Sequence, residues 1–461
     1  MKGKITFILL GILVILGVYV YLVEIKGKAE KERTEEKAKR IFVFEEPDVK
    51  KITIRRSDDT IICERDGEGW HILSPIQEKG FESAVTSLVS DVIQTMIERE
   101  ITEDINWSDY GLDQPELTVV VESYAGEMDS VFFGAENPTG SYLFVHKPGD
   151  PRVLLTGVNI RTALTKEVFD LRDKSVLPFE VDQVQQFTLR RKGEKDIIIQ
   201  KENNNWRIVQ PVFALANRTI VDGIIDQIDN AQIMTFEDEN PQNLNQYGLS
   251  RPEFDVTLSV GIDRIGKQFF VGKQKDTNRF YAREASRSVV FTVDSLLVGE
   301  LKTPLFELRD KRIVFFKEVD IYTIEFYKQG KPDFICHKDT AGDWQIDLPV
   351  KSKAKNWRIG SFFSFLAQVE MEDFVGENIS NLNQYGLHAP ETAVIFKDKE
   401  GQILVHLITG KKVGDDMVYV MDKVADWICI ATYNLIDNFH PNIDEYIETE
   451  ETEKTEENPS S

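Results

Sequence analysis

The chain has 461 residues, of which 41% are hydrophobic and 29% are charged, and its formal net charge is −23. This length predicts about three domains, and the composition is that of a globular protein rather than a disordered one. Because phosphate binding requires a basic surface, so acidic a chain argues against nucleic acid as a partner. The three cysteines, Cys63, Cys336 and Cys429, match neither a disulfide framework nor a zinc spacing, and we expect buried thiols.

A hydrophobic segment lies near the N-terminus. After a short tail at residues 1–4, residues 5–23 contain no charged side chain. A helix of this length spans about 28 Å, close to the hydrocarbon thickness of a bilayer, so the segment predicts a single transmembrane helix. A cleaved signal peptide is the alternative, but no small-x-small cleavage site follows Val23. Residues 24–45, in which acidic and basic side chains alternate, are expected to form a charged juxtamembrane stalk.

Two signals on the orientation of this anchor oppose each other. A short basic N-terminus is typical of a signal anchor, which translocates the chain that follows it. The basic residues between Lys26 and Arg40 would instead keep the body in the cytoplasm. We expect a single-pass protein of the bacterial inner membrane with its body outside the cytoplasm. A cytoplasm-facing membrane scaffold is the alternative.

A repeat organises the rest of the chain. The heptapeptide Asn243–Leu249 recurs unchanged at Asn381–Leu387, and Asp109–Leu112 is a looser third copy. The number of residues between successive copies of this motif is about one domain length, far above the roughly 20–50 residues of a solenoid repeat. We therefore predict an α+β protein, with antiparallel sheets and packed amphipathic helices in each repeat. The expected segments are repeat 1 at 46–180, repeat 2 at 181–318, repeat 3 at 319–443 and an acidic disordered tail at 444–461.

Each repeat begins with two strand patterns, the second of which ends in Trp-x-Ile-x-x-Pro. Apolar and polar residues alternate in Lys51–Arg56, as in a half-buried strand, and the proline ends the second strand because it has no N–H to donate. Recurrence of the tryptophan at one place favours core packing over stacking on a ligand. The three tryptophans are Trp70, Trp206 and Trp344.

A helix and a turn motif follow in every copy. Apolar residues at i, i+3, i+4 and i+7, such as Val85, Leu88, Val89 and Val92, indicate an amphipathic helix on a sheet. In the next motif, Tyr-Gly-Leu-x-x-Pro, the glycine suits the left-handed residue that closes a short helical turn. These pairs are Tyr110-Gly111, Tyr247-Gly248 and Tyr385-Gly386. A later glycine, followed by tyrosine, indicates a hairpin loop between two strands. These glycines are Gly134, Gly272 and Gly410.

An Arg-Asp pair closes the first two copies, Arg172-Asp173 in one and Arg309-Asp310 in the other. A catalytic role is conceivable, but we favour a helix end with local charge pairing that leads into the next copy. The third copy has Leu435–Phe439 at this place, without the arginine. This difference fits a joint that is needed only where another copy follows.

Motifs for catalysis and for cofactor binding are absent from the sequence. The six histidines show no metal spacing, and there is neither a nucleophile elbow nor a glycine-rich phosphate loop. We therefore expect no catalytic, cofactor-binding or metal-binding residue, and no cofactor. An envelope hydrolase acting on glycan or peptide, with its site between repeats, is the alternative.

The anchor, together with tandem Trp-x-Ile-x-x-Pro, Tyr-Gly-Leu-x-x-Pro and Gly-x(7–8)-Tyr motifs, resembles the domain-of-unknown-function family 4340 over residues 46–443. The resemblance implies a bacterial membrane-anchored protein of a kind often encoded beside ABC-transporter and gliding-motility auxiliary components, and it supplies no catalytic residue. The expected function is a non-enzymatic envelope scaffold or binding protein, accessory to an ABC-type transport or gliding-motility-like complex. Transporter subunits are then the expected partners, beside the membrane itself.

Overall fold

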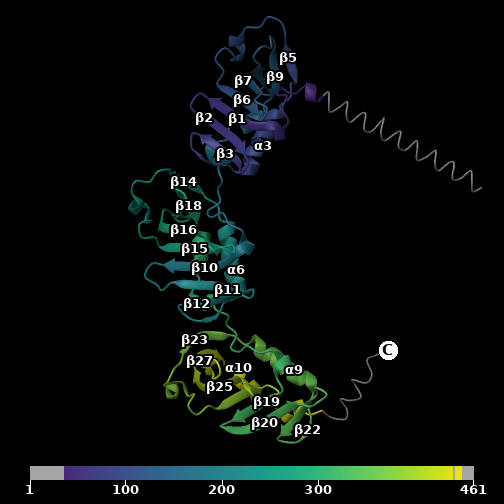
Figure 1. The fold of residues 1–461 in the computed structure, drawn as a ribbon, viewed down its shortest axis with the longest axis vertical. Helices are drawn as coiled ribbons and strands as arrows, with labels where there is room; N and C mark the ends of the chain where they lie inside the picture. The colour runs from purple at the N-terminus through teal and green to yellow at the C-terminus, as the bar shows by residue number, and fades with distance from the viewer. Residues whose placement is uncertain (1–35, 440–441, 449–461) are drawn as a thin grey trace, which may run out of the picture. The chain divides into compact units, whose positions relative to one another are not determined.

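The computed structural model describes residues 36–439 and 442–448 (Figure 1). Within these residues each of the three repeats forms one nine-stranded antiparallel sheet. The strand orders are equivalent: β4-β3-β2-β1-β6-β7-β8-β9-β5, β13-β12-β11-β10-β15-β16-β17-β18-β14 and β22-β21-β20-β19-β24-β25-β26-β27-β23. The three tandem repeats and their antiparallel sheets are confirmed. The repeats are mostly β, with less helix than the expected α+β class implies.

The strands have equivalent positions in the three repeats. The first sheet comprises β1 (Val49–Arg56), β2 (Thr60–Asp66), β3 (Gly69–Ser74), β4 (Glu78–Lys79), β5 (Arg99–Ile101), β6 (Leu117–Ser123), β7 (Met128–Glu136), β8 (Tyr142–His146) and β9 (Val153–Gly157). The second comprises β10 (Val184–Arg191), β11 (Ile197–Glu202), β12 (Asn205–Gln210), β13 (Ala214–Leu215), β14 (Thr235–Asp238), β15 (Phe254–Val260), β16 (Ile265–Gln274), β17 (Arg279–Glu284) and β18 (Val290–Asp294). The third comprises β19 (Thr323–Lys328), β20 (Lys331–Lys338), β21 (Trp344–Leu348), β22 (Ser352–Lys353), β23 (Met371–Glu377), β24 (Thr392–Lys397), β25 (Ile403–Val413), β26 (Met417–Asp422) and β27 (Trp427–Thr432).

Helices also recur at equivalent places. The longest helix of each repeat is α3 (Glu82–Ile93), α6 (Arg218–Asp229) or α9 (Asn356–Gln368). Two shorter helices follow the last hairpin of each sheet, namely α4 (Ile160–Leu164) and α5 (Val168–Leu171), α7 (Ser295–Glu300) and α8 (Leu305–Leu308), and α10 (Asn434–Asn438) and α11 (Ile443–Tyr446). The tyrosine motif forms the short 3-10 helices η3 (Trp107–Tyr110), η5 (Leu244–Tyr247) and η7 (Leu382–Tyr385).

The apolar stripe of the longest helix packs into the main core of its repeat. In α6 the buried residues are Val221, Ile224, Ile225 and Ile228, the four that the spacing predicts. The side chain of Asn217 caps this helix by accepting a hydrogen bond from the backbone N–H of Ile220 at 3.3 Å. Strand alternation places the sheet's own apolar residues in the same core, since every second residue of β15 is buried.

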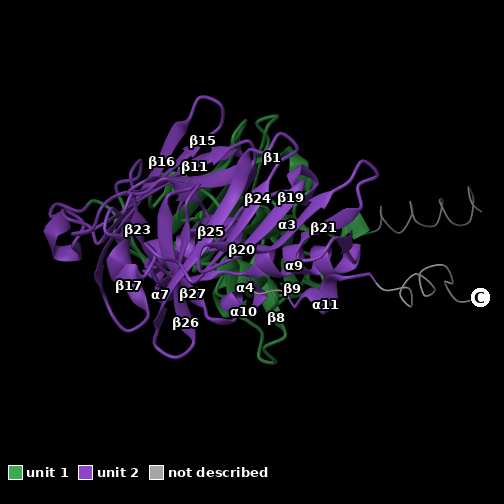
Figure 2. Cartoon of the chain, turned by 90° about the horizontal axis from the view of Figure 1, so that it is seen from below, with its two compact units in different colours: residues 1–176, 232–240, 289–292 green, residues 177–231, 241–288, 293–461 purple. Residues whose placement is uncertain are grey.

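Two compact units divide the chain (Figure 2). Unit 1 comprises residues 1–176, 232–240 and 289–292. It therefore contains the first repeat together with β14 and most of β18 from the second. Unit 2 comprises residues 177–231, 241–288 and 293–461.

The first and third repeats extend beyond their expected boundaries. Ile41, Phe42 and Phe44 are at most 6% exposed and belong to the first core, so the expected stalk at 24–45 includes residues of repeat 1. Tyr446 is 2% exposed and belongs to the third core, so the packed chain continues past residue 443 into the expected tail. Both boundaries were placed by charge, yet the buried residues lie beside charged ones.

The expected anchor at residues 5–23, and residues 449–461 of the expected tail, lie outside the described residues. None of the helices in the part of the chain that the structure describes is long and apolar enough to cross a membrane.

Candidate functional site

The recurrent tryptophans lie inside the main cores. Trp70, Trp206 and Trp344 are between 0% and 3% exposed, so none of them offers a free face to a ligand. The cation–π partner of each ring comes from the preceding strand. The side-chain charge lies 4.7 Å from the ring centre for Arg65 over Trp70, 5.4 Å for Lys201 over Trp206 and 5.2 Å for Lys338 over Trp344. The X-Pro bond at the end of each tryptophan-containing strand, β3, β12 or β21, is cis.

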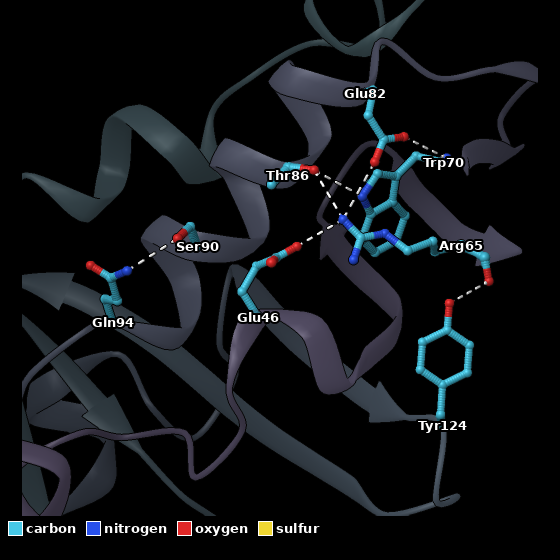
Figure 3. Close-up of polar contacts among 8 residues, drawn as sticks. All are labelled: Glu46, Arg65, Trp70, Glu82, Thr86, Ser90, Gln94 and Tyr124. Atoms are coloured by element: carbon cyan, nitrogen blue, oxygen red, sulfur yellow. Dashed lines mark hydrogen bonds and ion pairs between the residues drawn. The ribbon is translucent and has the colours of Figure 1, made fainter. Parts of the chain in front are cut away.

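In the first repeat this cation belongs to a polar cluster (Figure 3). Nη2 of Arg65 donates to Oε1 of Glu46 at 2.7 Å and to Oγ1 of Thr86 at 3.1 Å. The indole N–H of Trp70 donates to the same hydroxyl oxygen at 3.2 Å. The hydroxyl of Tyr124 donates to the backbone carbonyl of Arg65 at 3.3 Å. Arg65 and Thr86 contact the buried indole directly and hold it in place, while Glu46 and Tyr124 position Arg65.

The tyrosine-glycine motif is a turn that packs against its own sheet. Gly111, Gly248 and Gly386 have φ values of +65°, +73° and +73° and close η3, η5 and η7 in the left-handed conformation expected of them. In each repeat the following leucine is buried, and the tyrosine is half-buried. The tyrosine ring meets an aromatic ring of the neighbouring hairpin, as in the Tyr247–Tyr281 pair at 5.1 Å and the Tyr385–Tyr419 pair at 5.0 Å.

Gly134, Gly272 and Gly410 pack against the tyrosine-glycine turn of their own repeat. A Cβ atom at Gly134, Gly272 or Gly410 would overlap the carbonyl oxygen of Tyr110, Tyr247 or Tyr385, respectively. The hairpin that these glycines predicted is present, but each glycine lies within its first strand, at a shift in register, rather than in the loop. The reason for glycine is therefore close approach of the tyrosine carbonyl rather than a hairpin turn.

Arg172 joins the end of repeat 1 to β14 within unit 1. Its side chain is 5% exposed, and its guanidinium carbon lies 3.3 Å from the ring centre of Phe236. Nε donates to Glu78 at 2.6 Å, and Nη1 donates to Glu239 at 2.5 Å. The neighbouring Asp173 accepts hydrogen bonds from the backbone N–H and the hydroxyl of Ser175. The arginine is therefore a structural contact between two repeats, and the aspartate stabilises the turn that follows it.

Arg309 occupies the equivalent place between the second and third repeats. Its guanidinium carbon lies 3.7 Å from the ring centre of Phe374, and Nη2 lies 3.6 Å from a carboxylate oxygen of Glu377. Burial lowers the pKa of Arg309, although Glu377 acts in the opposite direction. Asp310 accepts from the backbone N–H of Arg312 at 3.1 Å and pairs with its guanidinium. This second joint has one carboxylate where the first has two.

The segment without an arginine in repeat 3 is not the one expected. Arg172 forms an isolated bridge with Gly80 and Arg309 forms one with Ala216, and the corresponding bridge of repeat 3 joins Ile447 to Ala354. The equivalent residue is therefore Ile447, after α11, rather than one in Leu435–Phe439. Leu435–Phe439 lies in and directly after α10, the first of the two short helices, whereas Ile447 follows the second one, as Arg172 and Arg309 do.

Buried titratable groups lie in the cores. The three cysteines are buried, as expected, and burial raises the pKa of the Cys63 thiol to about 12. Burial also raises the pKa of Asp422, whose carboxylate accepts hydrogen bonds from the backbone N–H groups of Val424 and Ala425. Among the described residues, no group of three or more His, Cys, Asp or Glu side chains is placed to hold a metal ion.

A hollow of about 280 Å³ lies on the face of the third sheet opposite to its main helix. We call it the β24 hollow. Across the sheet, Tyr327 lies beside Ala393 and Ala393 beside Ile408 in one row, while Ile395 lies beside His406 in the next. The side chains that define it are Tyr327, Ala393, Ile395, His406, Ile408 and Lys423. Burial, and then the charge of Lys423, lowers the pKa of His406.

Two further cavities lie in the first repeat, with volumes of about 540 Å³ and 390 Å³. In the larger one, Arg56 is paired with Asp59 and donates to the backbone carbonyls of Leu164 and Lys166, and Arg161 is paired with Glu136. Its cations are therefore already engaged.

A family model described as "Domain of unknown function (DUF4340)" matches residues 70–211, 206–346 and 344–458. The chain belongs to the DUF4340 family. Each match begins at a recurrent tryptophan, and the first two continue into the corresponding strand of the next repeat. The first two matches thus include Arg172 and Arg309, respectively, whereas the aromatic partner of each arginine lies within the next match. No curated protein and no solved structure matches this DUF4340 chain.

Sequence reasoning missed the partners of the joint arginines and the β24 hollow. The partners left a signal, because Phe236 and Glu239 recur as Phe374 and Glu377 with the same internal spacing. The hollow left a weaker one. Its alanine, Ala393, stands at the position of Asp255 in the second repeat, three residues after the proline of the tyrosine-glycine motif, but that the difference opens a hollow depends on the strand pairing.

Proposed function

We propose that this DUF4340 protein is a non-enzymatic, single-pass protein of the bacterial inner membrane, with its three repeats outside the cytoplasm. The repeats form a scaffold or binding body that is accessory to an ABC-type transport or gliding-motility-like complex. Support for the membrane placement comes from the uncharged segment at residues 5–23, which has the length of a membrane span.

The observation that carries the proposal is that the recurrent residues are buried and make structural contacts. A catalytic residue has to face its substrate, whereas the recurrent tryptophans are at most 3% exposed and the two joint arginines at most 8%. The recurrent glycines accommodate a backbone turn rather than a ligand. What recurs in this chain is therefore a framework and the means of linking one copy to the next, which suits a body that offers several similar surfaces to partners.

A reporter fusion tests the membrane orientation. The reporter is attached after Ser461, because α11 belongs to the third core and a fusion at Phe439 would remove it. A reporter active only outside the cytoplasm is the expected result, and deleting residues 5–23 should abolish membrane association. Activity only in the cytoplasm would replace this proposal with the cytoplasm-facing scaffold.

Affinity purification of the full chain tests the partner. We expect subunits of an ABC-type transporter to be recovered in near-stoichiometric amounts from crosslinked membranes. The double variant Arg172→Met, Arg309→Met should lower that recovery, because it removes both joints. The matched control is Arg218→Met, which removes an arginine paired with Asp222 on the surface of α6. Equal recovery from the double variant and wild type would contradict a scaffold that depends on its joints.

A further inference from the structure

The β24 hollow combines an apolar floor with a cation at one end. Ala393, Ile395 and Ile408 form the floor and are between 1% and 9% exposed. Cavities of roughly 150 Å³ with apolar walls accept a benzene ring, so a hollow of about 280 Å³ has room for a ring and a short chain. The apolar part of a ligand is therefore small.

The charged groups around the hollow leave one cation available. Glu325 is already occupied, since it accepts from Lys397 at 2.6 Å and from the hydroxyl of Tyr327 at 3.0 Å. Lys423 is exposed and has no ion-pair partner among the residues that the structure describes. Because the pKa of His406 is lowered, its imidazole is neutral at pH 7 and supplies a hydrogen-bond donor without a second positive charge.

The equivalent surface of the second repeat is filled. Asp255 stands at the position of Ala393, where it pairs with Arg190 at 3.2 Å and accepts from the side-chain amide of Gln268 at 2.7 Å. The backbone N–H of Ala285 donates to Gln268 as that of Lys423 donates to His406, so alanine occupies the position of the lysine. The third repeat thus differs from the second at two positions of this surface: Ala393 replaces Asp255 in the floor, and Lys423 replaces Ala285 at the charged end.

We propose that the β24 hollow binds a small carboxylate with an apolar body, the body lying on Ala393, Ile395 and Ile408 and the carboxylate meeting Lys423 and His406. A single ammonium group and a neutral imidazole match one negative charge, which favours a monocarboxylate over a phosphate dianion. This binding goes beyond the scaffold role and does not depend on it.

Calorimetric titration of the full chain in lipid nanodiscs tests the proposal, with 3-phenylpropanoate as the probe and empty nanodiscs as the reference. The amine of the same body, 3-phenylpropylamine, tests the charge. We expect saturable binding of the carboxylate and at least tenfold weaker binding of the amine. Absence of saturation below about 10 mM, or equal binding of the two probes, would overturn the proposal.

Variants locate the binding. Lys423→Ala should weaken binding of the carboxylate at least tenfold, and Lys399→Ala, which removes an exposed lysine of the β24–β25 turn, should leave it unchanged. Ala393→Asp should abolish binding, whereas Thr118→Asp, at the same register position of the first sheet, should not. Ala393→Val fills the floor without adding charge and covers the case in which the aspartate variant unfolds. Undiminished binding by folded Ala393→Val or Lys423→Ala protein would refute this location.

Discussion

The two joint arginines differ in a way that predicts unequal effects of the same substitution. Arg172 has two carboxylates within 2.6 Å and a ring beneath it, and removing one partner of a buried ion pair costs about 3–5 kcal/mol. Because the side chain of Glu239 is 43% exposed and regains water, we place the cost of Arg172→Met near 3 kcal/mol. Arg309 has one carboxylate at 3.6 Å, so Arg309→Met should cost about 1–2 kcal/mol, mainly from the lost cation–π contact.

Hydrogen exchange measures these costs locally, in β14 for the first joint and in β23 for the second. A loss of about 3 kcal/mol accelerates exchange through local opening by roughly two orders of magnitude, and a loss of about 1–2 kcal/mol by roughly tenfold. Arg218→Met, which breaks the exposed pair of Arg218 with Asp222, is the control, since a surface ion pair contributes about 0–1 kcal/mol. Equal acceleration at both joints, or an effect of the control as large as that of Arg172→Met, would refute the reasoning.

Three further predictions concern buried side chains. Tyr446→Ala should destabilise the third repeat by about 3–5 kcal/mol, because the tyrosine ring lies 5.2 Å from that of Phe334 in the core. Hydrogen exchange in β20 should become faster, and unchanged exchange would show that α11 is not part of the repeat. Asp422→Asn should stabilise the third repeat at pH 7. Burial raises the pKa of this carboxyl, so the wild-type repeat gains stability as the pH falls through that pKa, and pH-dependent urea unfolding should lose this gain in the variant. Cys63 should not react with a thiol reagent at pH 8 until the chain is denatured, because its pKa is raised to about 12, and rapid labelling of native protein would contradict this.

The sequence predicted what depends on periodicity. The stripe of α6 and the buried tryptophans follow from apolar spacing that recurs in all copies, and both are present. The end of repeat 3 was misplaced because Tyr446 lies among acidic residues, and its burial depends on contacts with β20 that charge does not reveal. The fold class was predicted with too much helix, because the short strands at the sheet edges, such as β4 and β5, have no alternation long enough to detect.

The candidate sites were less predictable, because their residues are distant from one another in the sequence. The ring beneath Arg172 is 64 positions further along the chain, and the pairing of Lys423 with His406 depends on the register of two strands. Contacts between distant residues are set by tertiary packing, which local patterns do not specify. The role of Gly272 was missed likewise, because the atom that excludes a side chain there is a backbone oxygen of another segment.

The central claim is that the recurrent residues of this DUF4340 protein build its framework in the same way three times. Its most direct test is hydrogen exchange on Gly134→Ala, Gly272→Ala and Gly410→Ala, each made singly. Because the new Cβ atom overlaps the tyrosine carbonyl in every repeat, each variant should loosen the tyrosine-glycine turn of its own repeat by about 1–3 kcal/mol or more, and that of no other. A variant with native exchange in its own repeat would contradict the claim, most clearly if it also lost binding of a partner.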